Sequence, residues 1–140
     1  MLTDSTIIRR EQRQPSFRVE PPEDWRALLR TRAHMLVTGS RTALAGFGRA
    51  ARSELREPVA SITATTPLFL EGARTLILND VHLLDPAGQQ RLLAWMNESR
   101  NAHTQVLSLT TARVFEFVTK GFDANLYYRL NTIYIELQDT

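Results

Sequence analysis

The sequence contains no cysteine, which excludes both disulfide bonds and thiolate metal ligands. Lysine is nearly absent as well, since Lys120 stands alone and the other sixteen basic residues are arginine. No apolar run approaches the roughly 20 residues of a membrane span. The first residues carry Asp4 and lack the apolar stretch of a signal peptide. From these absences we expect a cytoplasmic protein that makes no membrane contact.

The chain has 140 residues, of which 43% are hydrophobic and 23% are charged. That length and composition are typical of one globular domain with its own core. The net charge of +2 is uneven, because residues 1–60 contain eleven arginines against seven acids. Nucleic-acid binding usually needs basic side chains clustered on one face, and the arginines form no such cluster in the sequence. We therefore expect no DNA contact by this chain.

A short apolar run, Leu76-Ile77-Leu78, ends in two polar residues, Asn79 and Asp80. Such a run between turn signals predicts a strand buried on both faces, as in parallel sheets. Polar side chains at the carboxyl end of that strand lie where open α/β sheets bind their ligands. In nucleotide hydrolases this position carries one acid for Mg²⁺ and a second that positions water. Here the first of the pair is the neutral Asn79, and a buried strand with a polar end is an equally good interpretation.

The order of the predicted elements indicates an α/β fold, because strand patterns alternate with amphipathic helical patterns. We predict a three-layer structure with a mostly parallel five-stranded sheet. Residues 1–22 are predicted to form an N-terminal arm, with a short extended piece at 17–19, and residues 23–140 a single domain. The predicted strands are 34–39, 58–65, 75–80, 105–111 and 132–137, and the predicted helices are 23–31, one from about 45, one from 86, 112–119 and 123–130, with a short helix or turn at 67–73.

The helix that follows Asp85 has clear sequence signals. Asp85 is a good N-cap residue and Pro86 suits the first turn. We expect Leu92, Leu93 and Met96 to form the buried stripe of this helix, and Trp95 to lie at the edge of that stripe.

A strand, a turn and a helix follow one another around Gly39, which is the order in which a phosphate-binding loop occurs. Such a loop has a second glycine, a lysine and a hydroxyl residue five, six and seven positions after the first glycine. Counted from Gly39, these positions are Leu44, Ala45 and Gly46. The glycine that curls the backbone, the lysine and the Mg²⁺-binding hydroxyl are therefore all missing. The sequence predicts a degenerate Walker A motif.

Other polar residues show no catalytic or metal-binding pattern. Arg41 and Arg49 could contact a phosphate as point charges, but solvated arginines on a helix surface are the simpler interpretation. His34, His82 and His103 lie in different predicted elements, so we predict no metal site. No serine lies in the nucleophile-elbow motif of hydrolases, and no two carboxylates have the spacing expected of a general acid and a general base.

Three segments, Thr75–Val81, Gln89–Leu93 and above all Gly121–Asn131, resemble the AAA+ ATPase domain of bacterial sigma-54-dependent transcription activators. The hexapeptide Leu-Tyr-Tyr-Arg-Leu-Asn in the last segment is rather specific for that family. With Leu36-Val37-Thr38-Gly39 included, the likeness covers roughly residues 23–137. The resemblance implies a P-loop NTPase-like (AAA+) core. The family's small helical lid, receiver domain and helix-turn-helix have no counterpart in the sequence.

The resemblance also assigns the family's nucleotide-site positions. Its Mg²⁺-binding acid falls on Asn79, its catalytic glutamate on Asp80 and its sensor on Thr110 or Thr111. Gly39, Leu44, Ala45 and Gly46 occupy the phosphate-loop positions. With Asn79 and Thr111, these four residues form the family's cofactor site, which we expect not to function.

The family's arginines that reach into a neighbouring subunit's site fall on Asp123 and Arg129, so only the second arginine is kept. Asp80 and Arg129 would then be vestigial catalytic residues. The sigma-contacting Gly-Ala-Phe-Thr-Gly-Ala loop has no counterpart between the second and third predicted strands, so direct contact with a sigma factor is not expected.

Three hypotheses for function follow. The first is a non-hydrolysing AAA+-like interaction module that needs no cofactor and acts in transcription regulation through protein contacts. Its partner would be a related AAA+ activator or a second copy of the chain, bound around Arg129. The second is a weak ATPase or nucleotide sensor that binds ATP and Mg²⁺ and uses Asp80 and Arg129. The third is the output module of a response regulator expressed as a short chain.

Overall fold

The computed structural model describes residues 17–20, 24–64, 70 and 72–139. Within these ranges, six strands form one sheet in the order β1-β6-β2-β5-β4-β3. Strands β2 to β6 run parallel to one another, and β1 pairs antiparallel with β6 at the edge. The strands are β1 (Phe17–Glu20), β2 (Met35–Thr38), β3 (Val59–Thr63), β4 (Thr75–Asn79), β5 (Gln105–Thr110) and β6 (Ile133–Asp139).

The α/β class and the mostly parallel sheet are as predicted, but the sheet has six strands and not five. The additional strand, β1, lies within the segment predicted to be an arm. Phe17 and Val19 of this strand are buried in the core, and the backbone of Phe17 lies opposite Asp139 at the end of β6. Burial of these two side chains and edge pairing with β6 place this part of the predicted arm in the folded domain.

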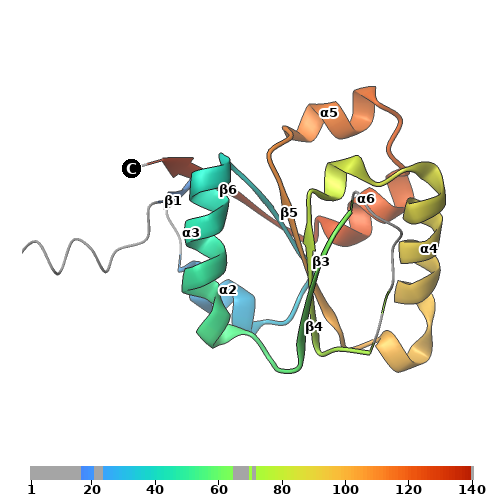
Figure 1. The fold of residues 1–140 in the computed structure, drawn as a ribbon, viewed down its shortest axis with the longest axis horizontal. Helices are drawn as coiled ribbons and strands as arrows, with labels where there is room; N and C mark the ends of the chain where they lie inside the picture. The colour runs from blue at the N-terminus through green and yellow to red at the C-terminus, as the bar shows by residue number, and fades with distance from the viewer. Residues whose placement is uncertain (1–16, 21–23, 65–69, 71, 140) are drawn as a thin grey trace, which may run out of the picture.

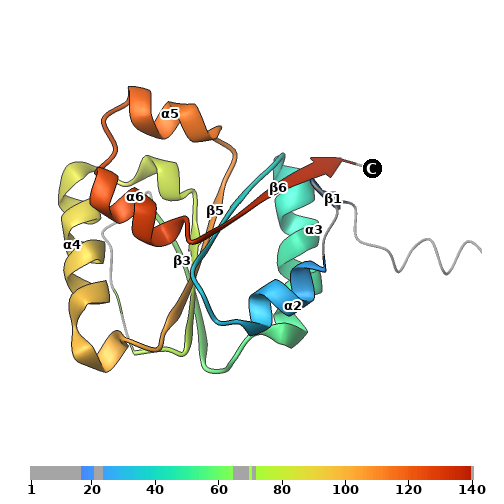
Figure 2. The same cartoon turned by 180° about the vertical axis from the view of Figure 1, so that it is seen from behind.

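Five α-helices cover the sheet in the described part of the chain. Helices α2 (Trp25–Arg30) and α3 (Arg41–Ala51) lie on one face, and α4 (Pro86–Asn97) and α6 (Ala124–Leu130) lie on the other, as Figures 1 and 2 show. Helix α5 (Val114–Thr119) lies at the end of the molecule where the parallel strands finish. Three short 3-10 helices, η1 (Arg52–Glu54), η2 (Val81–Leu83) and η3 (Ser99–Asn101), complete the described elements. The helix or turn predicted at 67–73 falls mostly outside the described residues.

Side-chain caps fix where the helices begin. Asp85 accepts a hydrogen bond of 2.7 Å from the Gly88 N–H, with Pro86 in the first turn of α4, as predicted. The buried face of α4 differs from the prediction, because Trp95 is buried and Leu93 only half-buried. The buried residues of α4 are thus Gln89, Leu92, Trp95 and Met96.

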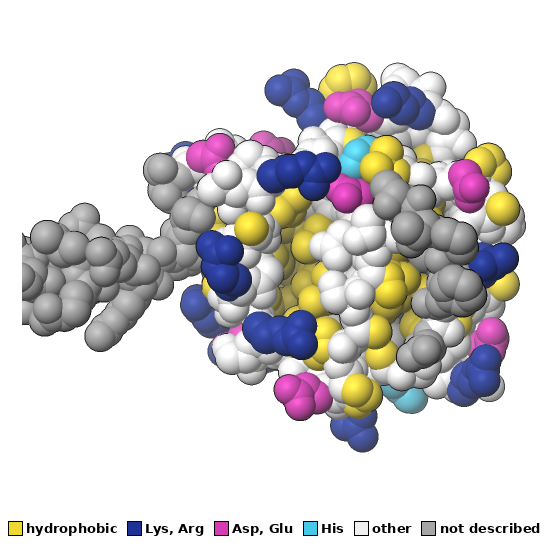
Figure 3. All heavy atoms as spheres, viewed as in Figure 1, with side chains coloured by type: hydrophobic (Ala, Val, Ile, Leu, Met, Phe, Trp, Pro, Cys, Tyr) yellow, Lys and Arg dark blue, Asp and Glu magenta, His cyan; other side chains and the backbone are white. Residues whose placement is uncertain are grey.

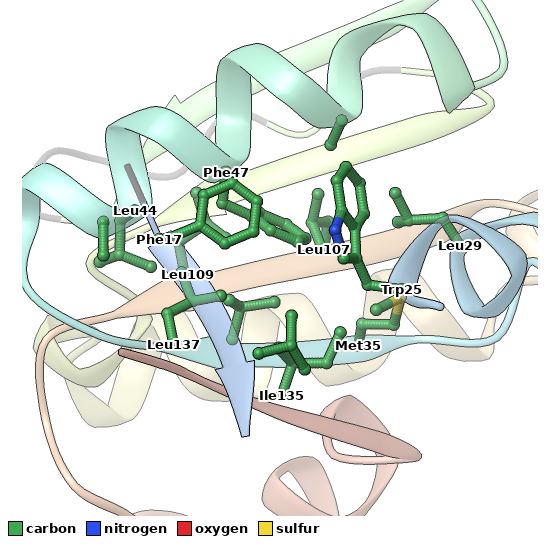
Figure 4. Close-up of a cluster of buried hydrophobic side chains, with 14 of the residues drawn as sticks. Phe17, Trp25, Leu29, Met35, Leu44, Phe47, Leu107, Leu109, Ile135 and Leu137 are labelled. Carbon is green, nitrogen blue, oxygen red and sulfur yellow. The ribbon is translucent and has the colours of Figure 1, made fainter. Parts of the chain in front are cut away.

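Each face of the sheet has its own hydrophobic core. Under α2 and α3, the rings of Phe17, Trp25 and Phe47 stack edge to face or tilted, with centroids 5.1–5.7 Å apart, above Met35 and Leu107 (Figure 4). Under α4 and α6, Leu92, Leu126 and Leu130 are at most 1% exposed. No helix of the described part is both long and apolar enough to cross a membrane.

Candidate functional site

The turn between β2 and α3 contains only Gly39 and Ser40. Helix α3 begins at Arg41, earlier than the predicted start near Ala45, because the Ser40 hydroxyl caps it by accepting a hydrogen bond of 3.1 Å from the Ala43 N–H. A phosphate-binding loop needs several residues with free backbone N–H groups between strand and helix. This turn is too short to form such a loop.

The three residues at phosphate-loop positions therefore lie inside α3. Leu44 packs into the core below α3, Gly46 is buried, and Ala45 is exposed. None of them presents a free backbone N–H at the end of the sheet, because each lies within the hydrogen-bonded helix. In this structure Leu44, Ala45 and Gly46 are therefore not placed to bind a phosphate, which is the role that the resemblance assigns to their positions.

A carboxylate lies beside the start of α3. The Ser40 hydroxyl donates a hydrogen bond of 2.7 Å to Oδ1 of Asp139, at the end of β6. The turn is also held tightly, since the Gly39 N–H donates to the Thr110 carbonyl at 3.2 Å. A Cβ atom on Gly39 would lie 2.9 Å from Cβ of Leu137, so only glycine fits here without a shift. A phosphate at this helix end would meet the negative charge of Asp139.

Asn79 is the last residue of β4 and Asp80 follows it, one residue beyond the end of the strand, and both side chains bond to neighbouring residues. The Asn79 amide donates hydrogen bonds of 3.1 Å to Ser61 Oγ and to the Ile62 carbonyl of the adjacent strand β3. Asp80 adopts the left-handed conformation, with φ of 57°, and its carboxylate lies 3.4 Å from the Arg41 guanidinium. Asp80 therefore faces a cation of its own chain.

The two candidate sensor threonines at the end of β5 have different environments. Thr110 is buried, its hydroxyl lies 2.7 Å from His82 Nδ1, and it accepts a hydrogen bond from the Ala112 N–H at 2.9 Å. Burial lowers the pKa of His82 below its usual value, although the nearby Asp80 opposes this effect. Thr111 is exposed. The structural role at this strand end therefore belongs to Thr110.

The resemblance assigns the family's two intersubunit arginines to Asp123 and Arg129. Asp123 caps α6 and Arg129 lies within it, on the face of the sheet opposite α3. Asp123 is the N-cap of α6 and accepts a hydrogen bond of 2.9 Å from the Leu126 N–H. Arg129 bonds to the Asn97 side-chain oxygen and, at 3.5 Å, to the Met96 carbonyl at the end of α4. Arg129 thus joins α6 to α4, and no contact brings it to Asp80.

The remaining candidate residues line two different cavities. A groove of about 420 Å³, here called the α3 groove, lies between α3 and the strands β3 and β4, and Ala45, Asn79 and Asp80 line it. A wider hollow of about 1020 Å³ lies between α5 and β6, and Gly39 and Thr111 line that one. The predicted cofactor-binding residues are therefore not assembled around one cavity.

Sequence reasoning did not identify two residues of this region. Asp139 was missed because its partner Ser40 is 99 positions away in the chain. Arg52, which lines the α3 groove, lies in η1 just after α3, where a sequence shows only another surface arginine. Among the residues described, no group of three His, Cys, Asp or Glu side chains is placed to hold a metal ion.

The sequence matches no protein-family model and no curated protein. Structural similarity is clearer. The crystal structure of NtrX from Brucella abortus in complex with ATP superposes with a TM-score of 0.64 at 19% identity, over 81% of this chain and 33% of that one. The NtrX complex with ADP gives a TM-score of 0.56 at 18% identity, over 79% of this chain and 33% of NtrX.

This chain thus corresponds to about a third of the length of NtrX. At this level of identity the similarity establishes the fold and not the activity. The α/β fold with its mostly parallel sheet is similar to the fold of the matched part of NtrX.

Proposed function

We propose that this chain is a non-hydrolysing AAA+-like interaction module that acts in transcription regulation through protein contacts and is related to sigma-54-dependent regulators. The observation that carries the proposal is the two-residue turn Gly39-Ser40, with the Asp139 carboxylate beside the start of α3. Phosphoryl transfer depends on positioning and on charge stabilisation of the phosphates. A site that offers a carboxylate there, and a neutral Asn79 in place of the Mg²⁺ ligand, provides neither.

The segment that most resembles sigma-54 activators, Gly121–Asn131, contributes to the folded core. It forms α6 and its approach, and Asp123 and Arg129 in this segment serve the packing of α6. A chain that keeps the fold without a phosphate site can still act through binding, because one fold supports many functions. The proposed partner is a related AAA+ activator or a second copy of the chain.

The experiment is sedimentation velocity of the purified protein, alone and mixed with the AAA+ domain of a sigma-54-dependent activator. The proposal expects a faster-sedimenting complex with the activator domain or a concentration-dependent dimer. A chain that remains a monomer in both samples, at concentrations up to about 100 µM, would contradict it, since regulatory contacts usually have dissociation constants below this range.

The alternative is a weak ATP-binding domain of a sigma-54-dependent response regulator. It is favoured by the fold shared with NtrX, which was crystallised with ATP. The test is thermal unfolding with millimolar ATP and Mg²⁺, because a ligand that binds the folded state raises the melting temperature. A saturable rise would favour this alternative.

A further inference from the structure

We propose that the α3 groove is the docking site for an acidic amphipathic helix of the partner protein. The inference rests on the proposed function, since it assigns the protein contact to one surface. Figure 3 shows this groove as a hollow with a hydrophobic floor, and the dark blue side chains that rim it along α3 are arginines. Leu44, Ile77 and Leu109 provide the apolar floor.

The groove exists because α3 is displaced from the middle of the sheet. Helix α3 packs mainly over β1 and β6, so no helix of the described residues lies over the face of β3 next to the groove. Ser61 and Thr63, which face this side of β3, are exposed. An open sheet face beside a helix offers the shape in which a further helix packs.

The charges of the groove favour an acidic partner. Arg41, Arg49 and Arg52 line it, and its single carboxylate, Asp80, is already paired with Arg41. Arg49 and Arg52 form no ion pair with any residue that the structure describes. Two unneutralised guanidinium groups at an apolar floor match carboxylates that flank apolar side chains.

The spacing of residues on α3 favours a helix as the bound element. Arg41, Ala45, Gly48 and Arg52 follow one another at intervals of four, three and four, so they share one face. The two small residues in the middle allow close approach, and the arginines flank them. From Arg41 to Arg52 this face extends about 16 Å, which matches about three turns of a docked helix.

Two kinds of variant test the site without disturbing the fold. Gly48 lines the groove, and a Cβ atom there would meet no atom within 4 Å, so Gly48→Leu starts from open space and places a bulky side chain at the groove. Leu also has a higher helix propensity than Gly, so the melting temperature should not fall. The double variant Arg49→Glu and Arg52→Glu reverses the charge of the rim. Arg100→Glu is the control for charge reversal on another surface, since Arg100 lies in η3, where it is paired with Glu98, and does not line the groove.

The probe is a fluorescein-labelled amphipathic peptide of about 15 residues, with leucines on one face and glutamates on both flanks. Fluorescence anisotropy should show binding to the wild-type chain with a dissociation constant below about 1 mM. Gly48→Leu and the charge-reversed variant should each weaken binding at least about tenfold, and Arg100→Glu less than about twofold. A peptide with the same leucines but lysine flanks should not bind.

The proposal is overturned if the acidic peptide does not bind, if the groove variants bind it as the wild type does, or if the lysine peptide binds equally well. It is also overturned if duplex DNA binds through Arg49 and Arg52 while the acidic peptide does not. Sedimentation velocity distinguishes a failure of the proposed docking site from a failure of the proposed function. A complex with the activator domain that Gly48→Leu leaves intact would refute the groove and spare the proposed function, whereas a wild-type chain that forms no complex would refute the proposed function.

Discussion

The two faces of the sheet are covered differently. Helices α4 and α6 close one face over a continuous core, and the segments Gln89–Leu93 and Gly121–Asn131, which resemble sigma-54 activators, belong to that face. On the other face α3 leans toward β1 and β6 and leaves the α3 groove beside β3. The two-residue turn Gly39-Ser40 leads into the helix of this open face. The comparison teaches that one fold can combine a closed face with an open one, and that the open face is the place to look for a binding surface.

The first way to break this comparison is to empty the core under α3. Phe47 is completely buried and contacts the rings of Phe17 and Trp25. We expect Phe47→Ala to lower the free energy of unfolding by about 3–5 kcal/mol, because it leaves a cavity. Urea unfolding measures this loss. Phe115→Ala, at a side chain 59% exposed, should change the same quantity by less than about 0.5 kcal/mol. An equally small loss of unfolding free energy for both variants would mean that the side chains under α3 are not packed as a hydrophobic core.

The second prediction concerns the strand end shared by both faces. Thr110→Val removes the hydroxyl that contacts His82 and accepts from the Ala112 N–H. We expect a loss of about 1–3 kcal/mol in unfolding free energy, since buried partners remain unpaired. Thr111→Val, at the exposed neighbour, should be close to neutral in the same unfolding experiment. The opposite ranking would mean that Thr111, and not Thr110, has the structural role at this strand end.

Two glycines on the open face should respond with opposite signs to alanine. Gly39→Ala places a Cβ 2.9 Å from Cβ of Leu137, so we expect a loss of about 1–3 kcal/mol. Gly48→Ala meets open space inside α3, so we expect a gain of about 0.8–1 kcal/mol from helix propensity. Thermal unfolding of both variants checks the pair. Destabilisation by Gly48→Ala would show that the groove is filled in solution.

The smallest expected effect belongs to the ion pair at the mouth of the groove. Arg41 is 74% exposed and lies 3.4 Å from Asp80. Exposed pairs of this kind contribute about 0–1 kcal/mol, so Arg41→Ala should change the unfolding free energy by no more than that. Measured at low and at high salt, the difference between variant and wild type should shrink as the salt concentration rises. A loss well above 1 kcal/mol would mean that the ion pair with Arg41 stabilises the left-handed conformation of Asp80.

The alternation of strand and helix patterns was sufficient to predict the fold class. The apolar runs at Leu76–Leu78 and Val106–Leu107 are buried on both faces of a parallel sheet, so their composition alone identifies them. Strand β1 was not assigned to the sheet, because it is held by pairing with β6 at the other end of the chain. Local sequence carries little information about such edge contacts.

The candidate site was predicted only in part. The positions at which a phosphate loop would need its glycine, lysine and hydroxyl residue could be counted directly from Gly39, and the structure places them inside α3. The helix start at Arg41 was missed although Ser40 is a good N-cap residue. The reason is that the residues after Gly39 were interpreted as a possible phosphate-binding loop. The Ser40–Asp139 contact and the groove beside β3 depend on tertiary packing that no local pattern encodes.

The most direct test of the central claim is an NMR titration of the ¹⁵N-labelled protein with ATP and Mg²⁺, following the backbone amides of Gly39, Ser40 and Arg41. These amides form the turn and the start of α3, where a phosphate would bind if the site were intact. The account predicts that their chemical shifts do not change at millimolar nucleotide. Saturable shifts of all three amides would contradict it.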